Sequence, residues 1–127
     1  MIHLDTNFLV ELVTVGSDGA RQVRAWLMAG REVGASAIAW SEFCNGPLTR
    51  EQKDAAFAVL NRKLRDFTWH DGEEAARLFN LGGRRRGSHA DCMIAASAIA
   101  AGASVATRNT ADFARFVPQG LLLESPV

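Results

Sequence analysis

The sequence predicts an α/β domain with a mainly parallel sheet and helices on both faces. Short apolar segments alternate with longer segments of helical periodicity along the chain, and this alternation is typical of parallel strands joined by helices. The chain has 127 residues, of which 48% are hydrophobic, enough for one core and too few for two ordinary domains. We therefore expect a single domain over residues 1–127.

Charge and cysteine content limit the possible functions. Basic and acidic side chains each number 14, so the formal net charge is +0 and an affinity for nucleic acid would need a local basic patch. The longest uncharged run, from Cys92 to Thr107, contains Ser and Gly and is short for a membrane span. Cys44 and Cys92 form no CxxC pair, which favours reduced thiols. These features predict a cytoplasmic protein without a membrane segment.

The first strand is predicted at residues 2–4, where apolar residues flank a histidine. Asp5 follows this strand, and Thr6 or Asn7 can cap the helix expected over residues 8–13. The carboxyl edge of an open α/β sheet is where ligands usually bind. Taken alone, Asp5 fits a ligand-binding residue and a simple strand end equally well.

The next segment is expected to form a helix over residues 20–28 and a second strand over residues 33–36. Ser36 is the predicted cap of a helix over residues 37–44. Within that helix Glu42 is an acid between large apolar side chains. A solvated surface position is the alternative for Glu42.

A long helix is predicted from Thr49, with Leu64 on its apolar face. Residues 67–69 are expected to form the third strand, and a helix with acidic residues in its first turn is expected over residues 71–81. Glycines then end that helix.

Three consecutive arginines, Arg84, Arg85 and Arg86, lie between glycines. Guanidinium groups bind phosphate through paired hydrogen bonds. A solvated loop is the alternative, because runs of like charge are commonly exposed to solvent.

An alanine-rich helix is predicted to follow Ser88 and to end near Ala101. Ser88 and Asp91 have the spacing of a capping box, with Asp in place of Glu. The small side chains suit a helix that lies close against the sheet, which would place Asp91 at the first turn of a buried helix. Capping and ligand binding both remain open for Asp91.

The remaining strands are predicted at residues 103–107 and 120–123, and residues 124–127 are expected to form a tail. Between the strands, Asp112 follows a candidate cap, Asn109, by three residues.

Four acidic residues thus fall near strand ends or helix starts: Asp5, Glu42, Asp91 and Asp112. Capping can explain each aspartate singly, but it explains neither Glu42 nor a common placement toward one edge. Clustered carboxylates repel one another unless protons or cations bridge them. Oxygen ligands without Cys or His favour Mg²⁺ or Mn²⁺ over zinc.

At these positions the sequence resembles the PIN-domain ribonucleases, specifically the VapC toxins of toxin–antitoxin modules. The matching segments are residues 4–7, 41–43, 89–96 and 107–113, in the order of the family and across nearly the whole chain. Each segment alone is weak evidence for the family. All four together, in a chain of this length, make a specific match to it.

The resemblance implies a five-stranded parallel sheet, a homodimer, an RNA substrate and a cognate antitoxin. It also implies a cation held chiefly by Asp5 and Asp91, with Glu42 and Asp112 completing the cluster. Candidate substrate-binding residues are Thr6, Asn7, Thr107, Asn109, Arg84, Arg85 and Arg86. The three arginines match no motif of the family, so their RNA role follows from charge alone.

The expected reaction is metal-assisted hydrolysis of RNA phosphodiester bonds. One or two cations could act, and Glu42 could serve as a ligand, a base or an outer residue. The alternative is a catalytically silent PIN-like module that binds nucleic acid or a partner. An antitoxin is expected to place an apolar segment in a groove near the first helices, where the large apolar residues are Trp26, Leu27, Trp40 and Phe43.

Overall fold

A five-stranded, wholly parallel sheet forms the centre of the computed structural model, which describes residues 1–124. The strand order is β3-β2-β1-β4-β5, which confirms the predicted parallel α/β class. The strands are β1 (Ile2–Leu4), β2 (Val33–Ser36), β3 (Leu64–Arg65), β4 (Ser104–Ala106) and β5 (Leu122–Leu123). Of the expected tail, residues 125–127 lie outside the described part of the chain.

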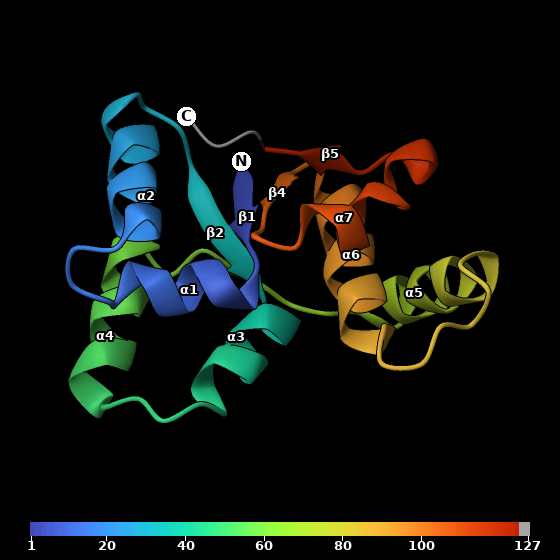
Figure 1. Cartoon of the computed structure of the whole chain (residues 1–127), viewed down its shortest axis with the longest axis horizontal. Helices are drawn as coiled ribbons and strands as arrows, with labels where there is room; N and C mark the ends of the chain where they lie inside the picture. The colour runs from blue at the N-terminus through green and yellow to red at the C-terminus, as the bar shows by residue number, and fades with distance from the viewer. Residues whose placement is uncertain (125–127) are drawn as a thin grey trace.

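Helices connect all the strands. They are α1 (Thr6–Leu12), α2 (Asp18–Met28), α3 (Ala37–Cys44), α4 (Arg50–Val59), α5 (Trp69–Leu81), α6 (His89–Ala101) and α7 (Thr110–Ala114), with a short 3₁₀ helix, η1 (Val117–Gln119). The chain moves from β1 to β3 in one direction and then returns past β1 to β4 and β5. Right-handed crossovers therefore place the first four helices and the later helices on opposite faces, as Figure 1 shows for α2 and α5.

The core lies along the central strand and the alanine-rich helix. Ile2 and Leu4 of β1 are fully buried, as are Ala95 and Ala96 of α6. Helix α6 contacts β2 and β4, so its small side chains allow the close approach to the sheet that the sequence predicted. No helix in the described part of the chain is long and apolar enough to cross a membrane.

The third strand lies earlier than predicted. It occupies Leu64–Arg65 and pairs with β2, whereas the segment over residues 67–69 leads into α5. Thr68 caps α5 through a capping box with Asp71, and Trp69 is 68% exposed. The prediction of a strand over residues 67–69 was therefore wrong, because β-favouring residues here serve to start a helix.

The helix predicted from Thr49 ends earlier than expected. Helix α4 stops at Val59, and Asn61 and Arg62 then adopt left-handed φ angles of 51° and 62°. These conformations end the helix and turn the chain, so Leu64 lies in β3 and not on the helical face. Asparagine adopts this conformation more readily than other residues with a side chain, so Asn61 was a local signal of the turn, whereas Arg62 gave none.

The helix starts depend on short polar side chains. Asp5 itself caps α1, accepting a hydrogen bond from Thr6 N, so the expected cap at Thr6 or Asn7 was wrong. Ser17 caps α2, which begins at Asp18 and not at residue 20. Ser36 caps α3 as predicted.

The strand order reverses beside β1, where β2 lies on one side and β4 on the other. Ligands in open α/β sheets bind at such a switch point, outside the carboxyl ends of the strands. Asp5 N donates a 2.9 Å hydrogen bond to Ala106 O, which joins the carboxyl ends of β1 and β4. The backbone therefore places Asp5 at this edge.

Candidate active site

Asp5 is the most constrained of the four acids. It is buried, with 4% of its surface exposed. Thr6 N donates to Oδ1 at 2.8 Å, and the Thr107 hydroxyl donates to Oδ2 at 2.7 Å. Thr107 Oγ1 also accepts a 3.0 Å hydrogen bond from Asn109 N. Both oxygens of Asp5 are thus oriented by the ends of the two strands that meet at the switch point.

Asp91 lies in the first turn of α6, but it does not cap this helix. Ser88 makes no side-chain capping bond, and its hydroxyl instead donates to Arg85 O at 2.7 Å. The capping box that the spacing suggested is therefore absent. Asp91 is left available for another role.

Charge and burial both act on Asp91. Burial raises the pKa of Asp91 to about 6 from its ordinary value of 3.8, and the negative charges of Asp5, Asp112 and Glu42 act in the same direction. Arg115 opposes this shift. Four carboxylates from four separate segments are therefore near enough to interact electrostatically. Helix capping alone would not bring them together.

Glu42 is an exposed residue of α3, and it is connected to the strand end through a threonine. The hydroxyl of Thr6 donates to Glu42 Oε1 at 2.7 Å. Since Thr6 N also donates to Asp5, one residue orients two of the acids. Glu42 is therefore both solvated, as the alternative interpretation expected, and part of the cluster.

Asp112, in the first turn of α7, pairs with the arginine loop. Arg85 Nη2 lies 3.3 Å from Asp112 Oδ1, and the two side chains are 58% and 40% exposed. Asn109, the expected cap of this helix, makes no side-chain capping bond. The interaction that holds Asp112 is therefore an exposed ion pair and not a helix-capping hydrogen bond.

The three arginines have different surroundings. Arg84 donates to Asn80 Oδ1 at 2.5 Å, and its guanidinium carbon lies 5.2 Å from the centroid of the Phe79 ring. Arg85 pairs with Asp112. Arg86 is exposed and has no hydrogen bond or ion pair within residues 1–124. The sequence could not separate these roles, because all three occupy one glycine-flanked loop.

The other candidate substrate contacts lie on the loops at the same edge. The Asn7 side chain accepts a long hydrogen bond, 3.4 Å, from Arg108 N. Asn109 is exposed beside the buried Thr107. Thr6, Asn7, Thr107 and Asn109 therefore come together from the segments after β1 and β4.

Sequence reasoning missed Arg115. Its Nε and Nη2 atoms are buried without a hydrogen-bond partner in the described residues, and its guanidinium carbon lies 4.5 Å from the centroid of the Phe116 ring. The charge of Arg115 also acts to lower the pKa of Asp91, but burial and the other carboxylates together outweigh it. No local signal distinguishes it from a surface arginine after a short helix.

A second missed pair joins α1 to the loop after β4. Arg108 Nε and Nη2 donate to Glu11 Oε2 and Oε1 at 2.6 and 2.8 Å. This pairing lowers the pKa of Glu11. The partners are 97 residues apart, so sequence spacing gives no indication of the contact.

The acids have the donor chemistry of a divalent-cation site. Within residues 1–124, no three Asp, Glu, His or Cys side chains are arranged closely enough to hold an ion as they stand. The four candidate acids offer carboxylate oxygens alone. Their all-oxygen donor set fits Mg²⁺ or Mn²⁺.

The parallel sheet and the acids at its switch point define an α/β domain with an acidic site. The sequence matches the PIN domain family over residues 2–117. The chain therefore belongs to the PIN domain family, as the motifs predicted. The comparison with curated protein sequences gives no match.

Solved structures with a similar fold come from toxin–antitoxin systems. A toxin–antitoxin complex from Klebsiella pneumoniae matches with a TM-score of 0.75 and 23% identity, covering 100% of both chains. VapBC2 from Rickettsia felis, bound to a DNA fragment from its promoter, matches at 0.71 and 24%, covering 98% of each chain. VapC20 from Mycobacterium tuberculosis, a sarcin–ricin loop cleaving toxin, matches at 0.69 and 17%, covering 99% of this chain and 100% of that one. At these identities the likeness establishes the fold.

Proposed function

We propose that this chain is a divalent-cation-dependent endoribonuclease and the toxin of a toxin–antitoxin pair. The observation that carries the proposal is the position of Asp91, whose pKa is raised to about 6 by burial and by three other carboxylates. Strongly shifted acids at a ligand-binding edge favour a functional site over a structural one. Membership of the PIN family and the toxin–antitoxin structures with this fold support the same activity.

Asp5 and Asp91 are the proposed principal ligands of Mg²⁺ or Mn²⁺, with Asp112 and Glu42 completing the site. When bound, the cation supplies charge neutralisation at the scissile phosphate and makes a water molecule more acidic. The donor atoms are all carboxylate oxygens, which is the chemistry these ions prefer.

The residues around the acids prepare this site. Thr107 and Thr6 N fix Asp5, and the Thr6 hydroxyl holds Glu42. Because both oxygens of Asp5 already have partners, its carboxylate has little freedom to rotate. Such preorganisation lowers the cost of binding a cation and a phosphate together.

Arg85 and Arg86 are the proposed phosphate contacts. The ion pair between Arg85 and Asp112 is largely exposed, so it contributes little stability and can be exchanged for RNA at small cost. Arg86 is exposed and unpaired within the described residues. Arg84 is less suitable, since Asn80 and Phe79 already hold it.

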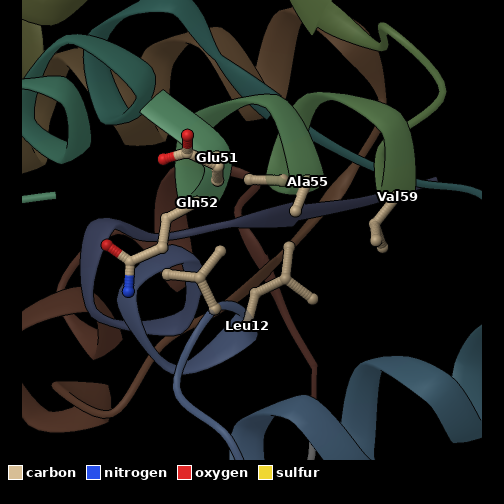
Figure 2. A pocket seen from close by; sticks show the side chains of 7 residues that line it. Leu12, Glu51, Gln52, Ala55 and Val59 are labelled. Carbon is tan, nitrogen blue, oxygen red and sulfur yellow. The ribbon is translucent and has the colours of Figure 1, made fainter. Parts of the chain in front are cut away.

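An apolar groove between α1 and α4 is the proposed seat of the antitoxin. Figure 2 shows Leu12 of α1 facing Ala55 and Val59 of α4, with Glu51 and Gln52 toward one end. The sequence analysis expected a groove near the first helices, and α1 forms one wall of this one. Its lining differs from the residues expected, because Trp26 and Phe43 are core residues and Trp40 packs against Phe43 and Phe57. Leu27 is partly exposed.

The homodimer that the resemblance implies, and the cytoplasmic location expected from the sequence features, remain part of this proposal. Analytical ultracentrifugation of the purified chain and fractionation of expressing cells test them.

The deciding experiment is cleavage of unstructured RNA with Mg²⁺, Mn²⁺ or excess chelator. Unpaired RNA is the expected substrate because its bases and backbone are accessible. We expect cleavage by the wild type with either cation and loss of cleavage in Asp91→Asn, which keeps the shape and removes a charge. Equal activity of wild type and variant would refute the mechanism, and RNA binding without cleavage would favour the silent binding module.

A further inference from the structure

The loop after β4 is clamped to α1 by a two-pronged ion pair. Arg108 directly follows Thr107, and its Nε and Nη2 atoms donate to the two carboxylate oxygens of Glu11 at 2.6 and 2.8 Å. Bidentate pairs of this kind fix orientation as well as distance. The clamp therefore restrains the loop in a defined position relative to α1.

Both partners of the clamp are themselves held. Glu11 Oε1 also accepts a 2.9 Å hydrogen bond from Gly19 N of α2. The guanidinium carbon of Arg108 lies 4.6 Å from the centroid of the Phe8 ring, and Phe8 is buried. A charged pair with a backbone donor and an aromatic support keeps one geometry better than two flexible surface side chains do.

The clamp lies next to the hydrogen bonds that orient Asp5. Asn109 N, on the other side of Arg108, donates to Thr107 Oγ1 at 3.0 Å, and Thr107 Oγ1 donates to Asp5 Oδ2 at 2.7 Å. Arg108 thus lies in the sequence between Thr107, whose hydroxyl contacts Asp5, and Asn109, whose amide contacts that hydroxyl. Movement of the loop would separate that hydroxyl from Asp5.

We propose that Glu11 and Arg108 are positioning residues that hold the Thr107 hydroxyl against Asp5 by clamping the loop after β4 to α1. The inference rests on the proposed nuclease function only for its activity measurements. The positioning itself can be measured without RNA or metal. It makes the loop part of the active site, although neither Glu11 nor Arg108 touches the reacting groups.

Glu11→Gln is the first test, because it keeps the shape of the side chain and removes its charge. We expect kcat to fall about 10- to 100-fold with KM little changed, since small displacements of a positioned group cost rate more than binding. We also expect weaker Mn²⁺ binding in calorimetry and faster hydrogen exchange of the Asn109 amide. The exchange measurement uses the metal-free protein.

A double-mutant cycle tests whether the clamp acts through Thr107. Thr107→Val removes the hydroxyl and keeps the branched shape. If the clamp acts through this hydroxyl, Glu11→Gln in the Thr107→Val background should lower kcat no further. Additive losses would mean that Glu11 acts by another route and would overturn the inference.

The chain contains a matched control for loss of a bidentate ion pair. Arg31 Nη1 and Nη2 donate to the two carboxylate oxygens of Glu124 at 3.0 and 3.1 Å, and Glu124 also accepts from Ser104 Oγ at 2.8 Å. Ser104 begins β4, so this pair lies at the opposite end of that strand from Thr107. Glu124→Gln should lower the melting temperature much as Glu11→Gln does, while kcat, Mn²⁺ affinity and Asn109 exchange stay at wild-type values.

Gly19→Ala disturbs the clamp without removing either charge. A Cβ at Gly19 would lie 2.6 Å from Glu11 Cβ and 2.8 Å from Glu11 Oε1, so Glu11 must move. The helix itself favours alanine over glycine at this position. We expect slower cleavage and faster Asn109 exchange, as in Glu11→Gln.

The outcomes separate this inference from the proposed function. Suppose that the wild type cleaves RNA and binds Mn²⁺, and that Glu11→Gln does both equally well. The positioning role of the clamp would then be refuted, and the proposed nuclease function would stand. A wild type without cation-dependent cleavage would refute the proposed function, and Asn109 exchange would still decide the clamp. Exchange equal in wild type, Glu11→Gln and Glu124→Gln would overturn it.

Discussion

The hydroxyl of Thr107 donates a 2.7 Å hydrogen bond to Oδ2 of Asp5, although the two residues are 102 positions apart. Each residue directly follows a strand, and β1 and β4 are neighbours in the sheet. The contact therefore depends on strand order. It fixes the acid that the proposed cation site is built around.

Thr107→Val should slow RNA cleavage about 10-fold or more, because a hydrogen bond to a charged group contributes about 1.5–3 kcal/mol. The substitution leaves one oxygen of a buried carboxylate without its partner. Cleavage rates under single-turnover conditions provide the measurement. Thr107→Ser keeps the hydroxyl and should cleave at nearly the wild-type rate; a loss as large as that of the valine variant would argue against the hydrogen bond.

Asp91→Asn should stabilise the metal-free protein at neutral pH. The pKa of Asp91 is about 6 in the folded protein and 3.8 ordinarily, so the folded state binds more protons between these values. Stability from this group is thus lost as pH rises from about 4 to about 6. After a discount for partial exposure, we expect a gain on the order of 1 kcal/mol at pH 7.5 that fades toward pH 4.

Urea unfolding in chelator at the two pH values measures this difference. Asp54→Asn is the control, because Asp54 is a surface residue of α4 whose carboxylate is 70% exposed and should change stability little at either pH. An Asp91→Asn protein that is less stable than the wild type at pH 7.5 would show that Asp91 has a structural role.

Replacing Arg85 and Arg86 together by Ala should weaken RNA binding and flatten its dependence on salt. For single-stranded RNA, the slope of log K against log salt should become shallower by about 0.7 for each phosphate that an arginine no longer neutralises. Both side chains are exposed, so the melting temperature should change little. Fluorescence anisotropy at several salt concentrations measures the slope.

Arg50→Ala serves as the control for that prediction, because Arg50 is an exposed arginine of α4 whose one ion pair among residues 1–124 is a long one, to Asp54. It should leave the salt slope unchanged. If the double variant of Arg85 and Arg86 behaves in the same way, the loop is merely solvated.

Ala55→Glu should weaken binding of the antitoxin without affecting RNA cleavage. Ala55 lines the apolar groove between α1 and α4, and a buried carboxylate at a partner interface carries a large desolvation cost. Copurification of a tagged chain with the product of the adjacent gene measures binding. Ala58→Glu, also exposed on α4 but outside this groove, should bind normally; equal binding by both variants would place the antitoxin elsewhere.

Local pattern was sufficient to predict much of the fold and to select the candidate acids. The alternation of strands and helices predicted the parallel sheet, and Ser36 was predicted to cap α3. These features depend on residues close in sequence, where periodicity and capping act. The four candidate acids were selected in the same way: the aspartates from their places near predicted strand ends or helix starts, and Glu42 from its place within the helix that follows the second strand.

Tertiary structure decided what surrounds those acids. Ser88 and Asp91 have the spacing of a capping box, yet the Ser88 hydroxyl donates to Arg85 O. The charges of the other carboxylates help to raise the pKa of Asp91. Local spacing is compatible with both arrangements. Only the packing of α6 beside the switch point selects between them.

The wrong position predicted for the third strand and the missed ion pair between Glu11 and Arg108 also have their origin in tertiary structure. The sequence determined which segments could form strands and helices and which side chains could bind a cation. It did not determine that β3 would form at Leu64–Arg65, nor that Glu11 would meet Arg108. Strand pairing and long-range ion pairs depend on which surfaces dock, and that docking is settled by burial summed over the whole core and not by the propensity of any one segment.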